Sequence, residues 1–518
     1  MVKIFIDDVP IEINPGETIL NAAKQNGINI PHFCYHPAFP PEGTCRMCLV
    51  EIEGAPKLEL ACSTQVREGM KIFTQSEKVV EARKAVLEFL LTEHPLDCPI
   101  CDQAGECKLQ DYYEEYGLFE SRYREDKNRQ PKRVSLGKNL LHDQERCVLC
   151  RRCVRFLREV TKTGEMGVFE RSNKTEVNIL EGKKIDNNYS GNLAQICPVG
   201  AITDSDFRFK TRNWFLKSGE SICPLCSRGC NISVQYFPGN PRLKVPKKVI
   251  RIQAEENLSV NGYWICDYGR YNYHYLNENR GTEIISQDPH QLSGWDEAED
   301  FAAEKIKRLL YKEKTSRIAL ILNSWLTNEE LFLIKKIFCD DLKVSEIYFI
   351  DPNDGESDEI LMTAERSPNR RGAKEIGFNL DPLSIDEFAA KNIDMVLVFG
   401  SYLAEKAAPS EIAEFFRGIK YKLLISPRSS EIDSMVDLFL PSAYPTEKKG
   451  SFVNVDGKIQ HFEPVFKSPG NSRPDVAILL EIAKKIGLNF HYYSQFKDVK
   501  LIYAEMKKEI SFFQEKND

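Results

Sequence analysis

Cysteine is concentrated in the first half of the chain, at spacings that suit metal binding. The 518-residue sequence contains 16 cysteines, of which all but Cys339 lie before residue 270. Cysteine thiolates are ligands of zinc ions and of iron–sulfur clusters. A protein that used cysteine only as a small apolar side chain would not divide it so unevenly. We therefore expect metal sites in the first half.

The first four cysteines have the spacing C-x10-C-x2-C-x13-C and suit a [2Fe–2S] cluster. Such a cluster needs four thiolates, and plant-type proteins draw three from one loop and the fourth from farther along the chain. The first gap is longer here than in the plant type, and a zinc site is the alternative. The set consists of Cys34, Cys45, Cys48 and Cys62.

The next three cysteines, spaced C-x2-C-x5-C, leave a four-ligand site one ligand short. A neutral imidazole nitrogen is a common metal ligand, and no other histidine lies as near to them as His94. Alone, such a histidine would more often be a surface or capping residue. Beside three thiols without a fourth partner it becomes the candidate ligand. The set consists of His94, Cys98, Cys101 and Cys107.

The third set has the bacterial ferredoxin pattern C-x2-C-x2-C with a distant Cys-Pro. Leu157 stands where a two-cluster ferredoxin has a further cysteine, and no second copy of the triplet precedes Cys197. We therefore predict one [4Fe–4S] cluster here, with zinc as the weaker alternative. The set consists of Cys147, Cys150, Cys153 and Cys197.

The fourth set, spaced C-x2-C-x3-C-x35-C, suits a [4Fe–4S] cluster or a structural zinc ion. Its members are Cys223, Cys226, Cys230 and Cys266. Gly229 and Gly262 are expected to form tight turns that bring backbone amides close to sulfur.

Cys339 is left over and is expected to be a buried, inert thiol. A body of about 270 residues has a radius of gyration of about 18 Å. Several redox centres in series could carry electrons across it, whereas zinc could not.

Short elements are expected to hold the first two sets. Residues 2–6 and 9–13 alternate as strands around a turn at Asp7-Asp8, and a helix over 17–26 ends at Gly27. A strand is predicted over 49–52. An amphipathic helix over 77–91, with Ser76 as its N-cap, is ended by Pro95, which presents His94 to the following loop.

The second half alternates apolar strands with helices, which favours a parallel α/β sheet. The strands are predicted at Ile318–Leu322, Ile347–Ile350, Met395–Phe399, Leu423–Ile425 and Leu438–Leu440, and the helices at Asp296–Leu310, Asn328–Phe338 and Ser410–Arg417. Residues 353–392 are expected to be an irregular surface excursion, and residues 500–518 a charged, fraying end. The pattern indicates no catalytic constellation.

Composition excludes several classes of protein. The net charge is −7 with both signs mixed along the chain, which does not favour nucleic acid as a partner, and the basic stretch 122–133 is interpreted as a solvated linker. There is no G-x-G, hence no dinucleotide fingerprint, and no phosphate-binding loop with its lysine. No apolar run is long enough to cross a membrane, and no signal or transit peptide is visible. We expect a bacterial cytoplasmic protein.

The four sets, in this order, resemble the G subunit of bacterial NADH:quinone oxidoreductase, respiratory complex I. The segments that carry the resemblance are residues 1–80, Glu93–Cys107 (EHPLDCPICDQAGEC), Arg146–Arg155 (RCVLCRRCVR), Gly191–Ala201 (GNLAQICPVGA), Ile222–Arg270 and, in the tail, Gly450–Gln460 (GSFVNVDGKIQ). The last two are similar to molybdopterin oxidoreductases. Active members commonly have C-x-K-G at the last cluster ligand, whereas Tyr268 replaces the lysine here. The resemblance therefore implies a relic scaffold without molybdopterin.

The resemblance also implies a fold and a domain order. An α+β first half would hold a β-grasp [2Fe–2S] ferredoxin domain, a His-Cys cluster domain and a ferredoxin-like [4Fe–4S] domain, followed by an α/β molybdopterin-oxidoreductase-like region with a parallel sheet. The expected boundaries are 1–78 for the [2Fe–2S] domain, 79–118 for the His-Cys domain, 119–217 for the ferredoxin-like domain, 218–278 for the fourth cluster domain and 279–518 for the α/β domain.

The function that the resemblance implies is electron relay by one [2Fe–2S] and three [4Fe–4S] clusters, as a subunit of an ion-translocating enzyme and without an NADH or quinone site of its own. The implied partners are a flavin-binding NADH-oxidising subunit, a thioredoxin-like [2Fe–2S] subunit, a ferredoxin-like subunit with two [4Fe–4S] clusters and quinone-side subunits of the peripheral arm. The complex would lie on the cytoplasmic face of the inner membrane, without membrane insertion by this chain. The alternative is a relay or catalytic subunit of a cytosolic NAD-linked hydrogenase or formate dehydrogenase.

Overall fold

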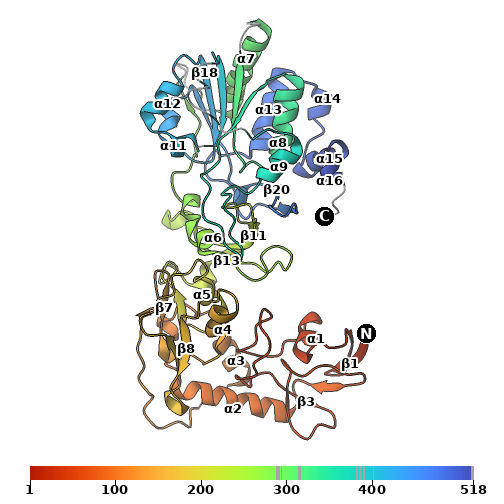
Figure 1. Cartoon of the computed structure of the whole chain (residues 1–518), viewed down its shortest axis with the longest axis vertical. Coiled ribbons are helices and arrows are strands. Elements are labelled where there is room, and N and C mark those ends of the chain that lie inside the picture. Colours follow the sequence, from red (N-terminus) through yellow and green to blue (C-terminus); the bar gives the residue numbers. More distant parts are fainter. Residues whose placement is uncertain are drawn as a thin grey trace. The chain divides into compact units, whose positions relative to one another are not determined.

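The chain forms two units, Met1–Lys217 and Ser218–Asp518, which are shown in Figure 1. The computed structural model describes all residues except 118–119, 288–291, 293, 313–316, 381–382, 384–387, 389–390, 401 and 515–518.

The first unit begins with a five-stranded mixed sheet in the order β2-β1-β5-β3-β4, with helix α1 packed against it. The predicted hairpin is confirmed: β1 and β2 pair antiparallel, and Asp7 and Asp8 both have positive φ. Strand β5 pairs parallel to β1, which gives the predicted β-grasp arrangement. The bounds are β1 Val2–Ile6, β2 Val9–Ile13, α1 Ile19–Gln25, β3 Leu49–Ile52, β4 Glu59–Leu60 and β5 Lys71–Phe73.

The rest of the first unit consists of short elements around one long helix, α2 (Glu77–Glu93), which continues two residues beyond the predicted end at residue 91 and ends directly before His94. Ser76 occupies the N-cap position as predicted, although its side chain makes no capping hydrogen bond. The other elements are η1 Cys98–Ile100, α3 Lys108–Tyr116, β6 Val134–Ser135, β7 Leu140–His142, η2 Gln144–Arg146, α4 Arg152–Glu159, β8 Met166–Phe169, η3 Ser172–Lys174, β9 Glu176–Ile179, α5 Asn192–Ile196, β10 Ile202–Asp204 and η4 Asn213–Phe215.

The second unit opens with a three-stranded sheet, β11-β12-β13, whose ends carry the fourth cysteine set. Cys223 follows β11, Cys230 precedes β12, and Cys266 is the N-cap of α6. The bounds are β11 Lys217–Ile222, β12 Asn231–Phe237, η5 Pro241–Leu243, β13 Lys248–Ala254, α6 Asp267–Tyr271 and η6 Asn272–Leu276.

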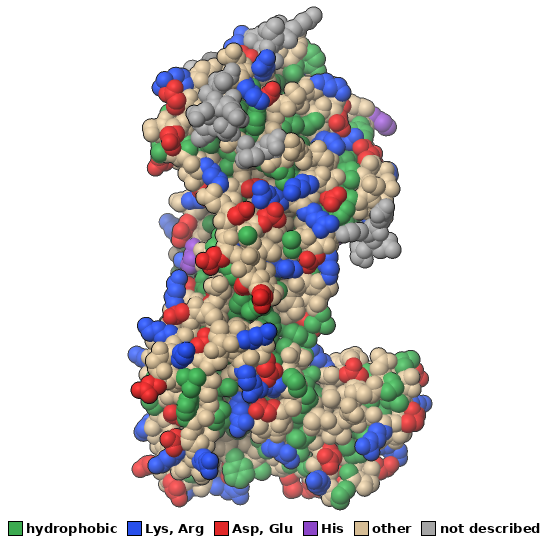
Figure 2. Space-filling view, in the orientation of Figure 1, with side chains coloured by type: hydrophobic (Ala, Val, Ile, Leu, Met, Phe, Trp, Pro, Cys, Tyr) green, Lys and Arg blue, Asp and Glu red, His purple; other side chains and the backbone are tan. Residues whose placement is uncertain are grey.

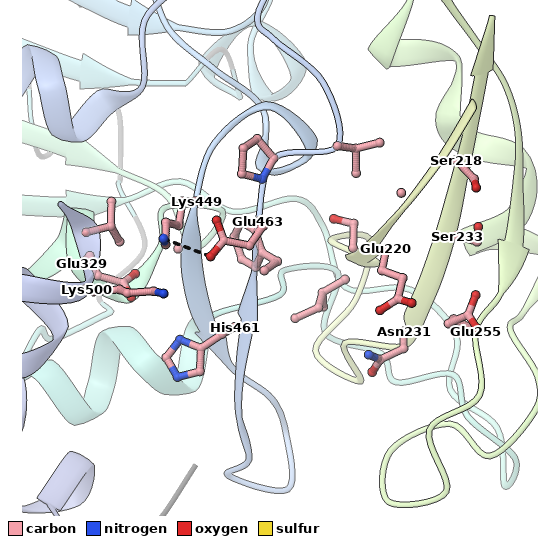
Figure 3. A pocket seen from close by; sticks show the side chains of 18 of the residues that line it. Ser218, Glu220, Asn231, Ser233, Glu255, Glu329, Lys449, His461, Glu463 and Lys500 are labelled. Carbon is pink, nitrogen blue, oxygen red and sulfur yellow. Dashed lines mark ion pairs between the residues drawn. The ribbon is translucent and has the colours of Figure 1, made fainter. Parts of the chain in front are cut away.

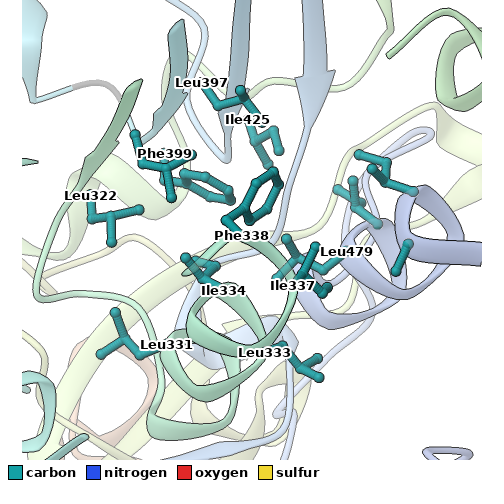
Figure 4. Packing of buried hydrophobic residues seen from close by; sticks show 14 of the residues in the cluster. Leu322, Leu331, Leu333, Ile334, Ile337, Phe338, Leu397, Phe399, Ile425 and Leu479 are labelled. Carbon is teal, nitrogen blue, oxygen red and sulfur yellow. The ribbon is translucent and has the colours of Figure 1, made fainter. Parts of the chain in front are cut away.

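The predicted parallel sheet follows, with the order β14-β19-β18-β17-β15-β16. All five predicted strands are present and parallel, and the edge strand β14 is an antiparallel addition that the sequence did not predict. Helix α8 (Asn328–Ile334) and the π-helical turn η8 (Lys335–Asp341) cover one face. There Ile334 from α8 and Phe338 from η8 belong to the same buried cluster as Leu397 and Ile425 from the strands (Figure 4). The bounds are β14 Ile285–Ser286, β15 Ile318–Leu322, β16 Glu346–Phe349, β17 Met395–Phe399, β18 Tyr421–Ser426 and β19 Leu438–Pro441.

The helices of this unit differ from prediction in four places. The helices predicted over 296–310 and 328–338 both end in π-helical turns, η7 and η8. The excursion over 353–392 contains helix α9. The C-terminal stretch is helical and packed: Ile502, Met506 and Phe513 are buried, so the predicted fraying is wrong for residues 500–514. Residues 515–518 lie outside the described residues. The bounds are α7 Trp295–Lys307, η7 Arg308–Lys312, α8 Asn328–Ile334, η8 Lys335–Asp341, α9 Arg370–Ile376, α11 Leu403–Lys406, α12 Pro409–Phe415, η9 Glu431–Ser434, η10 Pro445–Glu447, β20 Gly450–Val453, β21 Ile459–Phe462, α13 Asp475–Ile486, α14 Phe490–Tyr493, α15 Val499–Glu509 and α16 Ser511–Gln514.

Surface charge is mixed on the face that Figure 2 shows, where basic and acidic side chains are interspersed. None of the helices in the described part of the chain combines the length and the apolar character that a membrane crossing requires.

A buried ionic triad ties three segments of the second unit together. The Lys448 ammonium lies 2.7 Å from Glu330 Oε1 and 2.9 Å from Asp475 Oδ2, and all three side chains are almost fully buried. Burial raises the pKa of Glu330 to about 7, against the opposing attraction of Lys448. Two carboxylates therefore share one ammonium, and Glu330 takes up a proton near neutrality.

Glu330→Gln is expected to flatten the pH dependence of stability in the second unit. The ordinary pKa of this carboxyl is 4.5, so between this value and about 7 the folded state keeps a proton that the unfolded state has released. The contribution of Glu330 to the free energy of unfolding is full below the ordinary pKa and falls by roughly 2–3 kcal/mol as the pH rises to about 7. Denaturant titrations of both proteins at about pH 5 and about pH 8 test this. An equal stability difference at both pH values would contradict it.

Candidate iron–sulfur sites

The first cysteine set converges beneath the β-grasp sheet. Cys34 lies in the loop after α1, Cys45 and Cys48 precede β3, and Cys62 follows β4. The Cys34 and Cys45 sulfur atoms are 3.3 Å apart, and the backbone N–H of Phe33 donates to Cys45 Sγ at 3.4 Å. A hydrogen bond from Cys45 lowers the pKa of Cys34 to about 5, which favours the thiolate form that metals bind. Cys48 and Cys62 form the second hydrogen-bonded pair.

The second set lines one cavity of about 690 Å³, and all four predicted ligands, His94, Cys98, Cys101 and Cys107, contribute to its wall. His94 Nδ1 is buried and has no hydrogen-bond partner among the described residues. Burial, with Lys127 and Arg146 nearby, lowers the pKa of His94 to about 4. The imidazole is therefore neutral at pH 7, the form in which a ring nitrogen can bind metal.

The end of α2 fixes the position of His94. The Lys127 ammonium donates to the carbonyl oxygens of Leu91 at 2.7 Å and of Thr92 and His94 at 2.8 Å. A cation placed on the last carbonyls of a helix stabilises that end. The stretch 122–133, interpreted as a solvated linker, thus contains a residue that positions a candidate ligand. Its partners are backbone atoms, which have no sequence signature.

The third set surrounds a small enclosed cavity of about 20 Å³. Its four cysteines share the wall with apolar side chains, Val148, Val177, Val199 and Ile202. The backbone N–H of Leu149 donates to Cys147 Sγ at 3.4 Å. Burial raises the pKa of Cys197, while the backbone amides of Ile202, Val199 and Ala201 oppose this effect. Amides directed at sulfur stabilise negative charge there, as a cluster ligand requires.

The fourth set is buried in the second unit at the junction of β11, β12 and α6. The Cys223 N–H donates to the Cys230 carbonyl at 2.8 Å, and the Gly269 N–H donates to Cys266 Sγ at 3.3 Å. Gly229 and Gly262 have the positive φ expected of tight turns. Gly269 is the residue that the sequence did not single out: a β-carbon there would lie 3.2 Å from Cys223 Sγ.

Three of the sets share one hydrophobic core in the first unit. This core contains Cys34, Cys45, Cys107, Cys147, Cys150 and Cys197, packed with Phe33, Met47, Leu109, Tyr112, Val148 and Val199. The segment after Cys197 touches the second set: the Lys108 N–H donates to the Pro198 carbonyl at 3.2 Å, and a β-carbon at Gly200 would fall 2.1 Å from Cys101 Sγ. Arg146, beside Cys147, pairs with Asp97, beside Cys98, at 2.9 Å.

The donor chemistry of these sites fits iron–sulfur clusters. Buried thiols with apolar surroundings, backbone amides directed at sulfur and one neutral imidazole are the groups that hold such clusters. Within the described ranges, no three His, Cys, Asp or Glu side chains come close enough together to hold a single metal ion. Cys339, the remaining cysteine, is only half-buried; it packs against the core of the parallel sheet, and burial raises its pKa to about 11.

The largest cavity described, of about 1010 Å³, contains none of the candidate ligands (Figure 3). Glu220 and Glu255 line one side of it, and Lys449, His461 and Lys500 line the other. Lys449 pairs with Glu463 at 3.0 Å. It is a cleft of the second unit with charged groups of both signs, and its wall includes Ile222 and Asn231, the chain neighbours of Cys223 and Cys230.

Four protein families match separate stretches of the chain. They are a 2Fe-2S iron-sulfur cluster binding domain over residues 1–77, the NADH-ubiquinone oxidoreductase-G iron-sulfur binding region over 83–122, the ferredoxin-like domain of NADH-quinone oxidoreductase subunit 3 over 137–203, and molybdopterin oxidoreductase over 424–485. The G subunit of the NADH-quinone oxidoreductase of Rickettsia felis is 38% identical over 65% of this chain and 49% of its own length. The chain belongs to the G-subunit family of NADH-quinone oxidoreductases.

A second relative agrees with this placement in the G-subunit family. The NADH-ubiquinone oxidoreductase 75 kDa subunit of Reclinomonas americana is 37% identical over 70% of this chain and 52% of its own length. The chain thus spans about half the length of these relatives. A crystal structure of NAD+-reducing [NiFe]-hydrogenase in the H2-reduced state is 28% identical with a TM-score of 0.37, covering 40% of this chain and 90% of that one. The predicted family is confirmed, as is the presence of [2Fe–2S] and [4Fe–4S] binding domains.

His94→Cys is expected to retain a cluster in this chain and to lower its reduction potential, by an amount on the order of 100 mV. A thiolate adds negative charge where neutral imidazole adds none. In other clusters imidazole in place of thiolate raises the reduction potential, so the reverse exchange lowers it. Redox-titrated EPR of the purified chain measures the shift. The disappearance of one [4Fe–4S] signal without a new one would contradict simple ligand exchange.

Proposed function

We propose that this chain is an iron–sulfur electron-transfer subunit in the peripheral arm of an NADH:quinone oxidoreductase, which relays electrons from a flavin subunit towards quinone. The observation that carries the proposal is the common core of the first unit, which joins three of the four ligand sets. Family membership supports the same function, because the matched relatives carry that enzyme's name.

The proposed cofactors are one [2Fe–2S] and three [4Fe–4S] clusters, without molybdopterin. Cys34, Cys45, Cys48 and Cys62 would hold the [2Fe–2S] cluster, and the three other sets would each hold a [4Fe–4S] cluster. The five domains expected from the sequence, with boundaries after residues 78, 118, 217 and 278, are part of this proposal. When bound, the clusters would supply reversible one-electron chemistry.

The residues of the chain would set the order and the environment of the sites. Arg152 is buried and donates to the carbonyls of Tyr35 and of Ile196, at 3.1 Å for the latter; these are the neighbours of Cys34 and Cys197. It places one fixed positive charge between the first and third sets, where it stabilises added negative charge. The proposed order is the first set, the third set and then the His94 set, with the fourth set off the main path.

The partners follow from the same proposal. They are a flavin-binding NADH-oxidising subunit, a thioredoxin-like [2Fe–2S] subunit, a ferredoxin-like subunit with two [4Fe–4S] clusters and quinone-side subunits, assembled on the cytoplasmic face of a bacterial inner membrane. The exposed side chains of Phe89 and Leu96 border the His94 cavity, and Ile100, between Cys98 and Cys101, is also exposed. Together they offer apolar surface for a neighbouring subunit.

Metal analysis with redox-titrated EPR of the purified full chain tests the proposal. We expect about 14 iron atoms per chain, a visible absorption that dithionite bleaches, and separate [2Fe–2S] and [4Fe–4S] signals. A colourless, zinc-loaded protein would exclude electron relay. Stoichiometric molybdenum, tungsten or nickel would instead indicate a catalytic subunit of the formate dehydrogenase or hydrogenase type.

A further inference from the structure

Two basic side chains, Lys127 and Arg212, hold segments that carry ligands of the second cysteine set. Lys127 lies between α3 and β6, and Arg212 directly precedes η4, so the two reach the set from separate parts of the sequence. The hydrogen bonds described for both side chains end on backbone carbonyl oxygens. Both residues therefore combine a positioning contact with a positive charge beside the set.

The Lys127 ammonium covers the C-terminal end of α2. It donates to the carbonyl oxygens of Leu91 at 2.7 Å and of Thr92 and His94 at 2.8 Å, so that its three N–H donors meet three acceptors. The last carbonyls of a helix carry a partial negative charge equivalent to about half an elementary charge. Because α2 ends directly before the candidate ligand His94, this negative end lies beside the second set, and the ammonium more than offsets it.

The Arg212 guanidinium holds the loop that carries two of the cysteines of the set. Its Nη1 donates to the Cys101 carbonyl at 2.7 Å, and its Nη2 donates to the Pro99 carbonyl. The guanidinium lies 5.8 Å from the centre of the Trp214 ring, and a β-carbon at Gly105 would lie 2.8 Å from an atom of that ring. The segment of Arg212 is therefore packed against the same loop, which keeps this positive charge in place.

Neither cation forms an ion pair within the part of the chain that the structure describes. Arg146, a third cation of this region, is by contrast paired with Asp97 at 2.9 Å. Lys127 lines the cavity that all four candidate ligands share, and its charge contributes to the low pKa of His94. Two positive charges without a carboxylate partner thus lie beside a set whose fourth ligand is a neutral imidazole.

We propose that Lys127 and Arg212 raise the reduction potential of the second set and thereby make it the electron acceptor of the third set. The proposal rests on the proposed relay function, because it concerns a cluster at the second set. The step moves one electron from the third set to the second and neither forms nor breaks a bond. It adds one negative charge to the second set, and fixed cations and hydrogen bonds around a cluster stabilise such a charge.

Redox-titrated EPR of the purified full chain tests this role, with the nitrogen hyperfine coupling of His94 marking the signal of the second set. In Lys127→Met we expect the equilibrium constant for reduction of this cluster to fall about threefold to tenfold. A tenfold change corresponds to about 59 mV for one electron. Lys127→Arg keeps the charge and should change the constant less than about twofold. Arg212→Gln should also lower it, and Arg212→Lys should restore most of the loss.

Lys335→Met is the matched control. Lys335 donates to the carbonyl of Ile376, the last residue of α9, at 2.7 Å, so this variant also removes a lysine from a helix C-terminus, but in the second unit. Its reduction potentials should equal those of the unaltered chain, and thermal unfolding checks that all variants are folded.

Three results would overturn the role of the two cations. They are an unchanged potential of the second cluster in Lys127→Met, an equal fall in Lys127→Met and Lys127→Arg, and a loss of the nitrogen coupling in Lys127→Met. The last result would mean that the lysine only holds His94 in place. An unaltered chain without iron would instead refute the relay function itself, so the two failures are distinguishable.

Discussion

Cys197→Ala is expected to lose about four of the roughly 14 iron atoms per chain, together with one [4Fe–4S] EPR signal. The other three thiols of this set line the same small cavity, and its wall contains no further cysteine. The one imidazole of the wall, His142, ends strand β7, outside the segments that carry the four ligands. A cluster held by only three ligands in an apolar pocket is expected to dissociate. Folding and metal binding are coupled in such domains, so the first unit should also lose about 3 kcal/mol or more of stability.

Cys339→Ala is the matched control for this prediction. It removes the one cysteine outside the four sets, from a half-buried position against the core of the parallel sheet. Its iron content and EPR spectrum should equal those of the unaltered chain. Equal iron loss in both variants, or full iron retention in Cys197→Ala, would contradict the assignment of Cys197 as a ligand. Inductively coupled plasma analysis and EPR at matched protein concentration provide the measurement.

The elements that the sequence predicted well are those with a local signal. Asp7-Asp8 is flanked by two alternating apolar runs, and both residues adopt the left-handed conformation that short polar side chains tolerate. The strands of the parallel sheet are continuous apolar runs such as Met395–Phe399, all of which is buried. The prediction of His94 as a ligand rests on residue type and spacing, because three thiols left one of four positions empty, and His94 lines the same cavity as those thiols.

The features that were missed depend on tertiary contacts. Lys127 acts on backbone carbonyls 33 to 36 residues away, and nothing in its neighbourhood in the sequence marks it. Gly200 and Gly269 are needed because a sulfur atom from another segment lies against each of them. The C-terminal stretch was predicted to fray because of its charge, yet Ile502 and Met506 lie four residues apart on one helical face and are buried. In that segment the apolar face of the helix determines the packing more than the charged composition does.

Lys448→Met is expected to destabilise the second unit by about 3–5 kcal/mol at about pH 8. The ammonium is the only cation that contacts Glu330 and Asp475 among the described residues, and these carboxylates are buried at the beginnings of α8 and α13. Glu330 also accepts a hydrogen bond from the Thr327 N–H at 2.9 Å, which fixes it within the cap of α8. Without the ammonium, whose attraction lowers the pKa of Glu330, the Glu330 carboxyl would have to take up a proton and Asp475 would be buried without a cation, and methionine offers a charge to neither.

Lys449→Met is the matched control, which distinguishes the loss of the buried Lys448 ammonium from the loss of a lysine in general. The neighbouring ammonium is more exposed and pairs with Glu463 and Asp498, both of which reach solvent, so its removal should cost less than about 1 kcal/mol. At about pH 5 the Lys448→Met loss should shrink, because Glu330 is then protonated and one buried charge disappears. Urea denaturation of both variants at the two pH values measures these differences. Equal losses for the two lysines, or a Lys448→Met loss that does not change with pH, would show that the ammonium does not offset the two buried carboxylates.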